Sequence, residues 1–178
     1  SADQVLYSDD FRSNERGFDL LTQVVGRSGR GTKRGRAIIQ TYTPENPVIA
    51  LASHQDYVHF YQQEILFRKA MLYPPFADIV VIGFVGEQES KVAKASQLFL
   101  EMLSHLASKE YSELPIRALR PTPAQVAKVS NKYRYKLMIK CKNNLTFRTM
   151  LSRLLVACGK EKAFAGVTVY ADSNPDMI

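Results

Sequence analysis

Three long polar side chains, a glutamine and two arginines, recur at helical spacing near the start of the chain. Gln23, Arg27 and Arg30 stand at i, i+4 and i+7, so a helix would project all three from one side of its axis. A guanidinium group offers a planar fork of N–H donors that fits phosphate oxygens, and it stabilises the charge that develops on a transferring phosphoryl group. The spacing therefore indicates a phosphate-contacting site, with a solvated arginine- and glycine-rich turn as the simpler alternative.

A second set of basic side chains alternates with apolar ones in the last third of the chain. Arg134, Lys136 and Lys140 fall on one parity with Lys132 in phase, while Tyr135 falls on the apolar parity. A strand would place these charges on one face, where their repulsion costs stability unless an anionic partner or water relieves it. The set predicts contacts with a phosphate backbone or an acidic peptide, and an ordinary solvated sheet face is the alternative. Because Tyr135 lies on the other parity, base stacking is disfavoured.

The positive charge of the chain is unevenly distributed. Its 178 residues include 24 Lys+Arg and 17 Asp+Glu, which gives a formal net charge of +7. The segment RSGRGTKRGR at 27–36 is basic without an acid, and residues 114–160 contain no Asp or Glu. Basic stretches of this kind favour nucleic acid or another acidic partner.

The composition excludes several classes of protein. With 46% hydrophobic residues the chain can build a core, and no apolar run approaches the roughly 20 residues that cross a bilayer, so we expect a globular protein without a membrane partner. Cys141 and Cys158 form no C-x-x-C pair, which argues against a zinc site and predicts core thiols in a reducing compartment, the cytoplasm. His54 and His59 are five apart, a poor spacing for one metal ion on a helix.

The elements that would position the phosphate-contacting residues precede a double proline, Pro74-Pro75. The hydrophobic pattern predicts a helix with an apolar stripe over residues 14–28, a strand rich in β-branched residues over 36–42, and a long helix over 55–72. Pro44 and Pro47 are expected to break the chain between the strand and the long helix. The double proline is the predicted domain boundary.

The part after the double proline predicts the order β-α-β-β-α-β with one extra hairpin strand. The expected strands are 79–85, 116–119, 125–129, 133–141 and 167–170, and the expected helices are 88–108 and 145–158. This mixed α/β order is that of the ferredoxin-like α+β fold, in which two helices cover one sheet face and leave the other available.

The string Q-V-V-G-R-S-G-R-G at 23–31 resembles the last conserved motif of superfamily-two helicases, in which the glutamine and arginines reach the nucleotide between two RecA-like lobes. Ser28 stands where that motif often has alanine. Further matching segments are Asp10-Phe11-Arg12, Glu15-Arg16, Gly35-Arg36-Ala37, Glu64, Arg68, Tyr73-Pro74-Pro75-Phe76, Pro121-Thr122-Pro123-Ala124, Tyr133-Arg134-Tyr135 and Asp172. With these, the chain resembles the PriA (primosomal protein N-prime) family of bacterial replication-restart helicases over essentially its whole length, and we expect a fragment of a longer protein.

The resemblance implies a division of the chain into three parts. Residues 1–53 would be the C-terminal part of the second RecA-like lobe, 54–73 a connecting helix, and 74–178 a ferredoxin-like C-terminal domain. Gln23, Arg27 and Arg30 would contact ATP as half of a catalytic site, with the arginines at the γ-phosphate. The family's Walker loop, magnesium-binding acidic box and zinc-binding cysteines lie upstream, so ATP, Mg and zinc belong to the parent protein. We expect the chain alone neither to hydrolyse ATP nor to bind zinc.

The activity implied by the resemblance is ATP-driven 3′→5′ movement on DNA at a stalled fork. The implied partners are branched and single-stranded DNA, the acidic tail of single-stranded DNA-binding protein, and other primosome proteins. Lys132, Arg134, Lys136 and Lys140 are the candidates for contacting DNA or that tail.

Two other classes of protein fit part of the sequence. A stand-alone, non-enzymatic nucleic-acid-binding ferredoxin-like module would explain the charge, although such a module would not need the 23–30 string on one helix face. A purely protein-binding adaptor would show no salt-dependent affinity for DNA.

Overall fold

The computed structural model describes residues 1–8, 10–28, 36–173 and 175. The chain divides into two compact units, an N-terminal unit over Ser1–Met71 and a C-terminal unit over Leu72–Asp176. None of the helices in the described ranges is long and apolar enough to cross a membrane.

The N-terminal unit is helical. Its helices are α1 (Asp3–Leu6), α2 (Ser13–Ser28), α3 (Pro47–Ser53) and α4 (Tyr57–Met71). The helices predicted over 14–28 and 55–72 are therefore confirmed as α2 and α4. Their apolar faces meet where the rings of Phe18 and Phe60 stack with centroids 4.2 Å apart. Leu6, Leu21, Val48, Ile49 and Ala52 complete this small core.

The prediction of a strand over residues 36–42 is wrong, because this segment has no regular secondary structure. A strand needs a neighbouring strand for its backbone groups, and the described part of the N-terminal unit offers none. The segment is held by α1 instead. The Ala2 N–H donates to the Gln40 carbonyl at 3.0 Å, and the Tyr42 N–H donates to the Asp3 carboxylate at 3.1 Å. Hydroxyl hydrogen bonds from Ser1 and Thr41 lower the pKa of Asp3 to about 2.

Pro47, the second of the two prolines after this segment, starts a helix. Pro47 is the first residue of α3, a position where a missing N–H costs nothing and the fixed φ favours a helix. The side-chain oxygen of Asn46 accepts from the Val48 N–H at 2.9 Å and caps the helix. This short helix was not predicted from the sequence.

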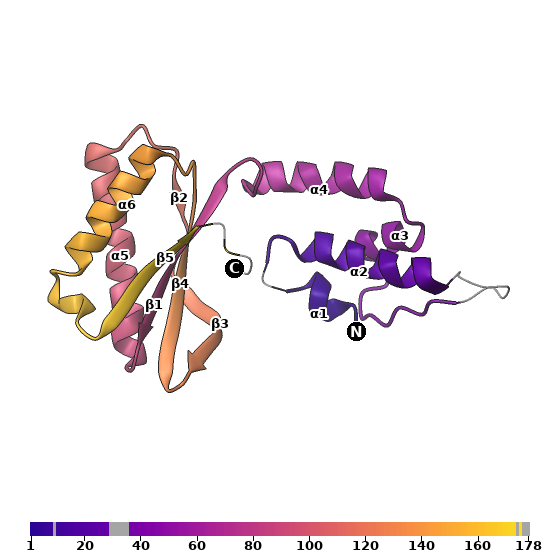
Figure 1. The fold of residues 1–178 in the computed structure, drawn as a ribbon, viewed down its shortest axis with the longest axis horizontal. Coiled ribbons are helices and arrows are strands. Elements are labelled where there is room, and N and C mark those ends of the chain that lie inside the picture. Colours follow the sequence, from indigo (N-terminus) through magenta and orange to yellow (C-terminus); the bar gives the residue numbers. More distant parts are fainter. Residues whose placement is uncertain (9, 29–35, 174, 176–178) are drawn as a thin grey trace. The chain divides into compact units, whose positions relative to one another are not determined.

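The C-terminal unit is an α+β domain with a five-stranded antiparallel sheet (Figure 1). Its elements are β1 (Asp78–Gly86), α5 (Glu89–Glu110), β2 (Arg117–Ala118), β3 (Thr122–Val129), β4 (Lys132–Cys141), α6 (Leu145–Cys158), a 3₁₀ turn (Lys162–Phe164) and β5 (Val167–Ser173). The strand order is β2-β4-β1-β5, and β3 pairs with β4 as the extra hairpin strand. This is the ferredoxin-like arrangement, as predicted.

Helices α5 and α6 both lie on one face of this sheet (Figure 1). The rings of Phe84 on β1 and Phe99 on α5 meet edge to face with centroids 5.5 Å apart, at the centre of the core. The helix-side core also contains Val80, Ile82, Val92, Leu103, Leu137, Ile139, Phe147, Met150 and Leu154. We call the opposite side of the sheet the outer face.

The β3–β4 hairpin turns through two residues, Ser130 and Asn131, with φ of 48° and 63°. Two positive φ values in a two-residue loop are typical of a type I′ turn, whose twist suits a hairpin. The pairing register shifts between Pro123 and Lys128, so β3 bulges away from β4 in its middle. The hairpin fixes where β4 begins and therefore where its basic residues lie.

Candidate nucleic-acid interface

Strand β4 separates apolar from basic residues by its pleat. Leu137, Ile139 and Cys141 are buried against α5 and α6, whereas Arg134 and Lys136 alternate with them on the outer face. Lys132 continues the basic parity at the exposed start of the strand. The alternation predicted for this strand is present in the structure.

The basic side chains of β4 have small or apolar neighbours on β1. In the antiparallel register, Arg134 is opposite Val85 and Lys136 is opposite Gly83, and opposed residues project to the same face. No acidic side chain on β1 therefore offsets these two charges on the outer face. Among the described residues, Lys132 and Arg134 have no ion pair, which leaves their charge available to an anionic ligand.

Lys140 differs from the other three candidate residues. It is only 5% exposed, and its Nζ lies 3.8 Å from the ring centroid of Tyr73. Burial lowers the pKa of Lys140, and the charge of Arg117, its partner across the β2–β4 ladder, lowers it further. The structure thus separates Lys140 from the exposed end of the strand that carries Lys132.

Tyr170 on β5 adds an aromatic ring to the outer face, a position that was not predicted from the sequence. Tyr170 is opposite Gly83 in the β1–β5 register. A Cβ built on Gly83 would lie 2.2 Å from Cζ of that ring, so the ring occupies the space that a side chain at residue 83 would fill. Tyr135, by contrast, lies on the helix side, and its hydroxyl donates to Glu89 at 3.5 Å. The signal in the sequence was a glycine inside an apolar strand, which marks a close approach by another group.

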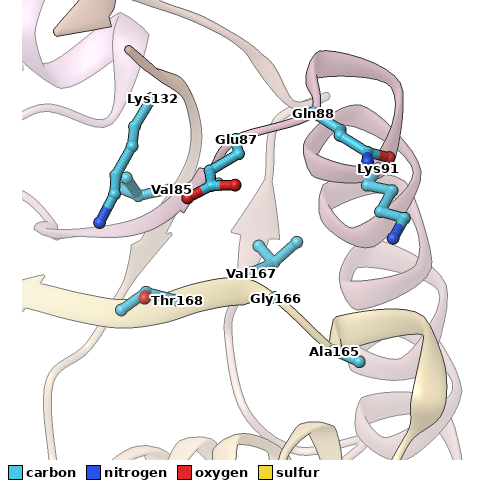
Figure 2. A pocket seen from close by; sticks show the side chains of 10 residues that line it. Val85, Glu87, Gln88, Lys91, Lys132, Ala165, Gly166, Val167 and Thr168 are labelled. Carbon is cyan, nitrogen blue, oxygen red and sulfur yellow. The ribbon is translucent and has the colours of Figure 1, made fainter. Parts of the chain in front are cut away.

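A hollow of about 270 Å³ opens where β4 begins and where β1 and β5 meet the N-terminus of α5 (Figure 2). Its lining includes Val85, Thr168 and Lys132, and Figure 2 shows Lys132 and Lys91 on opposite sides of it with Glu87 between them. The two lysines do not converge on one point, so the hollow extends the basic end of β4 rather than forming a separate anion pocket.

A larger hollow of about 640 Å³ combines apolar and basic walls at the opposite end of β4. Phe76 and Ile116 provide apolar surface, and Arg117 and Lys142 provide charge beside the buried Lys140. Asp78 is the acidic residue of the lining, and its carboxylate accepts from the Asn143 N–H at 2.8 Å. A peptide that carries both acidic and apolar side chains has the chemistry to fit this hollow.

The helicase-like residues fall on α2. Gln23 and Arg27 are both exposed and stand four residues apart in its last turns, so they share a helix face, whereas Arg30 lies outside the described residues. Gly26, which lies between Gln23 and Arg27 in the sequence, is also exposed, and a Cβ there would lie 3.2 Å from Nε2 of Gln55. The helix therefore presents two of the three predicted residues to solvent.

His54, His59 and the two cysteines all take part in structural contacts. His59 Nδ1 lies 2.7 Å from the Asp56 carboxylate, and the described residues contain no cluster of three or more possible metal ligands. Cys141 and Cys158 are free thiols buried in the core, as predicted. Burial, with a smaller contribution from the charge of Asp78, raises the pKa of Cys141 to about 12. Burial, with a smaller contribution from Glu161, raises the pKa of Cys158 to about 11.

The fold and the outer face define a ferredoxin-like α+β domain with a basic central strand. The model of the family "Primosomal protein N C-terminal domain" matches residues 69–175, so the chain belongs to this family. The Replication restart protein PriA of Bacillus subtilis (strain 168) is 35% identical over 178 residues, which is 100% of this chain and 22% of that protein. The protein of the same name from Synechocystis sp. is also 35% identical over 178 residues, or 20% of its length.

A relative of lower sequence identity also matches almost the whole chain. The Replication restart protein PriA of Treponema pallidum is 32% identical over 176 residues, which is 98% of this chain and 25% of that protein. The chain thus spans between a fifth and a quarter of the length of these relatives. Among solved structures, a hydantoinase/carbamoylase family amidase from Burkholderia ambifaria aligns over 55% of this chain and 27% of its own at 18% identity and a TM-score of 0.34, which is too low to support an argument.

Proposed function

We propose that the chain is the C-terminal region of a replication-restart helicase of the PriA type and that its C-terminal unit binds DNA at branched forks. The observation that carries this proposal is the placement of Arg134 and Lys136 on the outer face of β4, with Lys132 at its exposed end, beside β1 residues that carry no compensating acid. Cationic side chains at fixed spacing attract a phosphate backbone and release its counterions. The relatives named as replication restart proteins support the same reading.

For the N-terminal unit we propose the role of the closing part of a second RecA-like lobe, with residues 54–73 as the connection to the C-terminal domain. Gln23 and Arg27 on the exposed face of α2, together with Arg30, would contact ATP held by the rest of the parent protein. The magnesium and zinc sites would also lie in the rest of the parent, which we place in the bacterial cytoplasm. In the parent, Arg27→Ala should lower DNA-stimulated ATP hydrolysis by about 10³-fold while ATP still binds.

We also propose a protein partner for the C-terminal unit, the acidic tail of single-stranded DNA-binding protein. The 640 Å³ hollow supports this, because Arg117 and Lys142 flank an apolar wall made by Phe76 and Ile116. Other primosome proteins would be assembled through the parent. An acidic, apolar peptide should bind this chain, and Arg117→Glu should weaken that binding without changing the affinity for DNA.

The DNA-binding proposal is tested by the anisotropy of a labelled forked DNA titrated with the chain at several salt concentrations. The triple variant Lys132/Arg134/Lys136→Glu should lose most of the affinity and much of the salt slope. The matched control is Lys94/Lys109/Lys160→Glu, which reverses the charge of three exposed lysines outside β4. It changes the net charge of the chain by the same amount as the triple variant on β4. If both variants weaken binding to the same extent, the attraction comes from net charge alone and the outer face is not the site.

A further inference from the structure

We propose that Tyr170 is a stacking surface for an unpaired base of single-stranded DNA whose phosphates contact Arg134 and Lys136. This inference rests on the DNA-binding function proposed above and adds the kind of DNA that the outer face accepts. Three observations carry it: the position of the ring, its access to solvent, and the positive charge on β4.

The ring of Tyr170 lies across the central strand rather than beside its own strand. Cζ, Cε1 and Oη would be 2.2, 2.4 and 2.6 Å from a Cβ on Gly83, so the ring covers the backbone of β1 at that glycine. Gly83 is in turn opposite Lys136, so Tyr170, Gly83 and Lys136 form one row across three strands. The missing side chain at residue 83 is what allows the ring to point toward the basic strand.

The ring remains accessible in this position. Tyr170 is 41% exposed, which leaves ring surface for a ligand while the backbone of β1 supports it from below. An aromatic ring that is already held in place loses little conformational entropy when a base stacks on it, and every base has a face that can stack.

The charges around the ring give a direction to the bound strand. Arg134 lies one row along from Lys136, and Lys132 lies beyond it, all toward the hollow of Figure 2. Asp172, opposite Val81, lies on the other side of Tyr170 and repels phosphate there. A single strand would therefore run from Tyr170 along β4 to Lys132, with stacking at one end and phosphate contacts along the strand. It would leave β4 before Glu87, whose carboxylate lies in the hollow and repels phosphate. An acidic peptide could use the same charges and pack an apolar side chain on the ring, but only a nucleic-acid ligand would show an affinity that depends on its bases.

The same ring also has a purely structural explanation, because an aromatic side chain that covers a glycine stabilises a sheet. The two explanations differ in what they predict. A structural ring affects folding and is indifferent to the bases of a bound strand, whereas a stacking ring makes the affinity depend on them.

The test compares a labelled oligothymidylate with an abasic strand of the same length and charge, using the whole chain. Tyr170→Ala should lower the affinity for oligothymidylate about five-fold or more and leave the abasic strand unchanged. Tyr170→Phe should bind both strands as the unmodified chain does. Gly83→Ala should reproduce the loss, because the new Cβ would displace the ring. Tyr42→Ala, which removes an exposed tyrosine of the N-terminal unit, is the matched control.

A spectroscopic measurement separates stacking from a change in overall affinity or fold. A 2-aminopurine in the strand should be quenched when bound by the unmodified chain and by Tyr170→Phe, and should stay bright in saturated complexes of Tyr170→Ala. Equal preference for oligothymidylate over the abasic strand with and without Tyr170 would overturn the stacking proposal alone. Unchanged binding of both strands by Lys132/Arg134/Lys136→Glu would overturn the DNA-binding function on which it rests.

Discussion

The guanidinium of Arg68 on α4 donates from Nε to the Glu64 carboxylate at 2.9 Å, one helical turn away. It also donates from Nη2 to Glu15 on α2 at 2.9 Å, so one side chain ties the two longest helices of the N-terminal unit together. Glu64 is 8% exposed and accepts a further hydrogen bond from Asn14 at 3.2 Å. These contacts make Arg68 the counter-ion of a buried carboxylate.

Removal of Arg68 should therefore destabilise the N-terminal unit. Arg68→Met keeps the apolar stem and leaves Glu64 buried without its charge partner, which we expect to cost about 2–3 kcal/mol. Hydrogen exchange of the α2 and α4 amides should accelerate accordingly. Lys69→Met, an exposed neighbour on the same helix, is the control. Equal exchange rates in the two variants would show that the buried pair contributes nothing.

Phe99 should be essential to the C-terminal core. It is fully buried at 0% exposure, and its ring packs against that of Phe84. Phe99→Ala removes that contact and leaves a cavity, so the free energy of unfolding should fall by about 3–5 kcal/mol. Urea unfolding measures this fall. Leu145→Ala, at an exposed position on α6, should change it by less than about 0.5 kcal/mol, and a similar loss in both variants would contradict the assigned core.

The two buried thiols should make the C-terminal unit less stable at high pH. Unfolded thiols ionise near pH 9, whereas burial raises the pKa of Cys141 to about 12 and of Cys158 to about 11. The folded state therefore holds protons that the unfolded state releases. The free energy of unfolding falls as the pH rises above 9, by up to about 1.4 kcal/mol per pH unit for each thiol.

Urea midpoints measured between pH 7 and pH 10.5 test this slope. The double variant Cys141→Ala/Cys158→Ala should show a flatter dependence than the unmodified chain. Both thiols should also resist a disulfide reagent at pH 8 until the chain is unfolded. Rapid modification of the folded chain would contradict the burial of either cysteine.

Lys136 and Lys140 should differ as DNA contacts although they share a strand and a parity. Lys136 is half-buried on the outer face, while Lys140 is buried with its ammonium over Tyr73. Lys136→Met should lower the salt slope of DNA binding by about one, and Lys140→Met should leave it unchanged. Anisotropy titrations at several salt concentrations give both slopes. A loss of slope on substitution of Lys140 would show that this lysine leaves its pocket to meet phosphate.

The C-terminal unit could be predicted from the sequence because its elements are each specified locally. Each element shows its own hydrophobic pattern: an apolar run in β1, apolar residues three and four apart in α5, and strict alternation in β4. The order of these elements along the chain leaves few ways to form one sheet. The strand predicted over 36–42 had the same local signal and is absent, because β-branched residues favour a strand only where a neighbour accepts their backbone hydrogen bonds.

The candidate site was predicted only in part, and the reasons are physical. Parity placed the basic residues of β4 on one face, but the burial of Lys140 depends on Tyr73, which approaches from outside the sheet. Tyr170 meets Lys136 only through the β1–β5 and β1–β4 registers, which pair residues far apart in the chain. A single sequence specifies the period of a strand more clearly than the register between strands.

Strand β4 uses alternate residues for two different purposes. Leu137 and Ile139 pack into the core, while Arg134 and Lys136 lie on the outer face. Substitutions on one parity therefore leave the other largely untouched. Over evolutionary time such a strand can exchange its charges, and with them its ligand, without a compensating change in the helices behind it. Related domains with this fold would then diverge fastest in what they bind and slowest in how they pack.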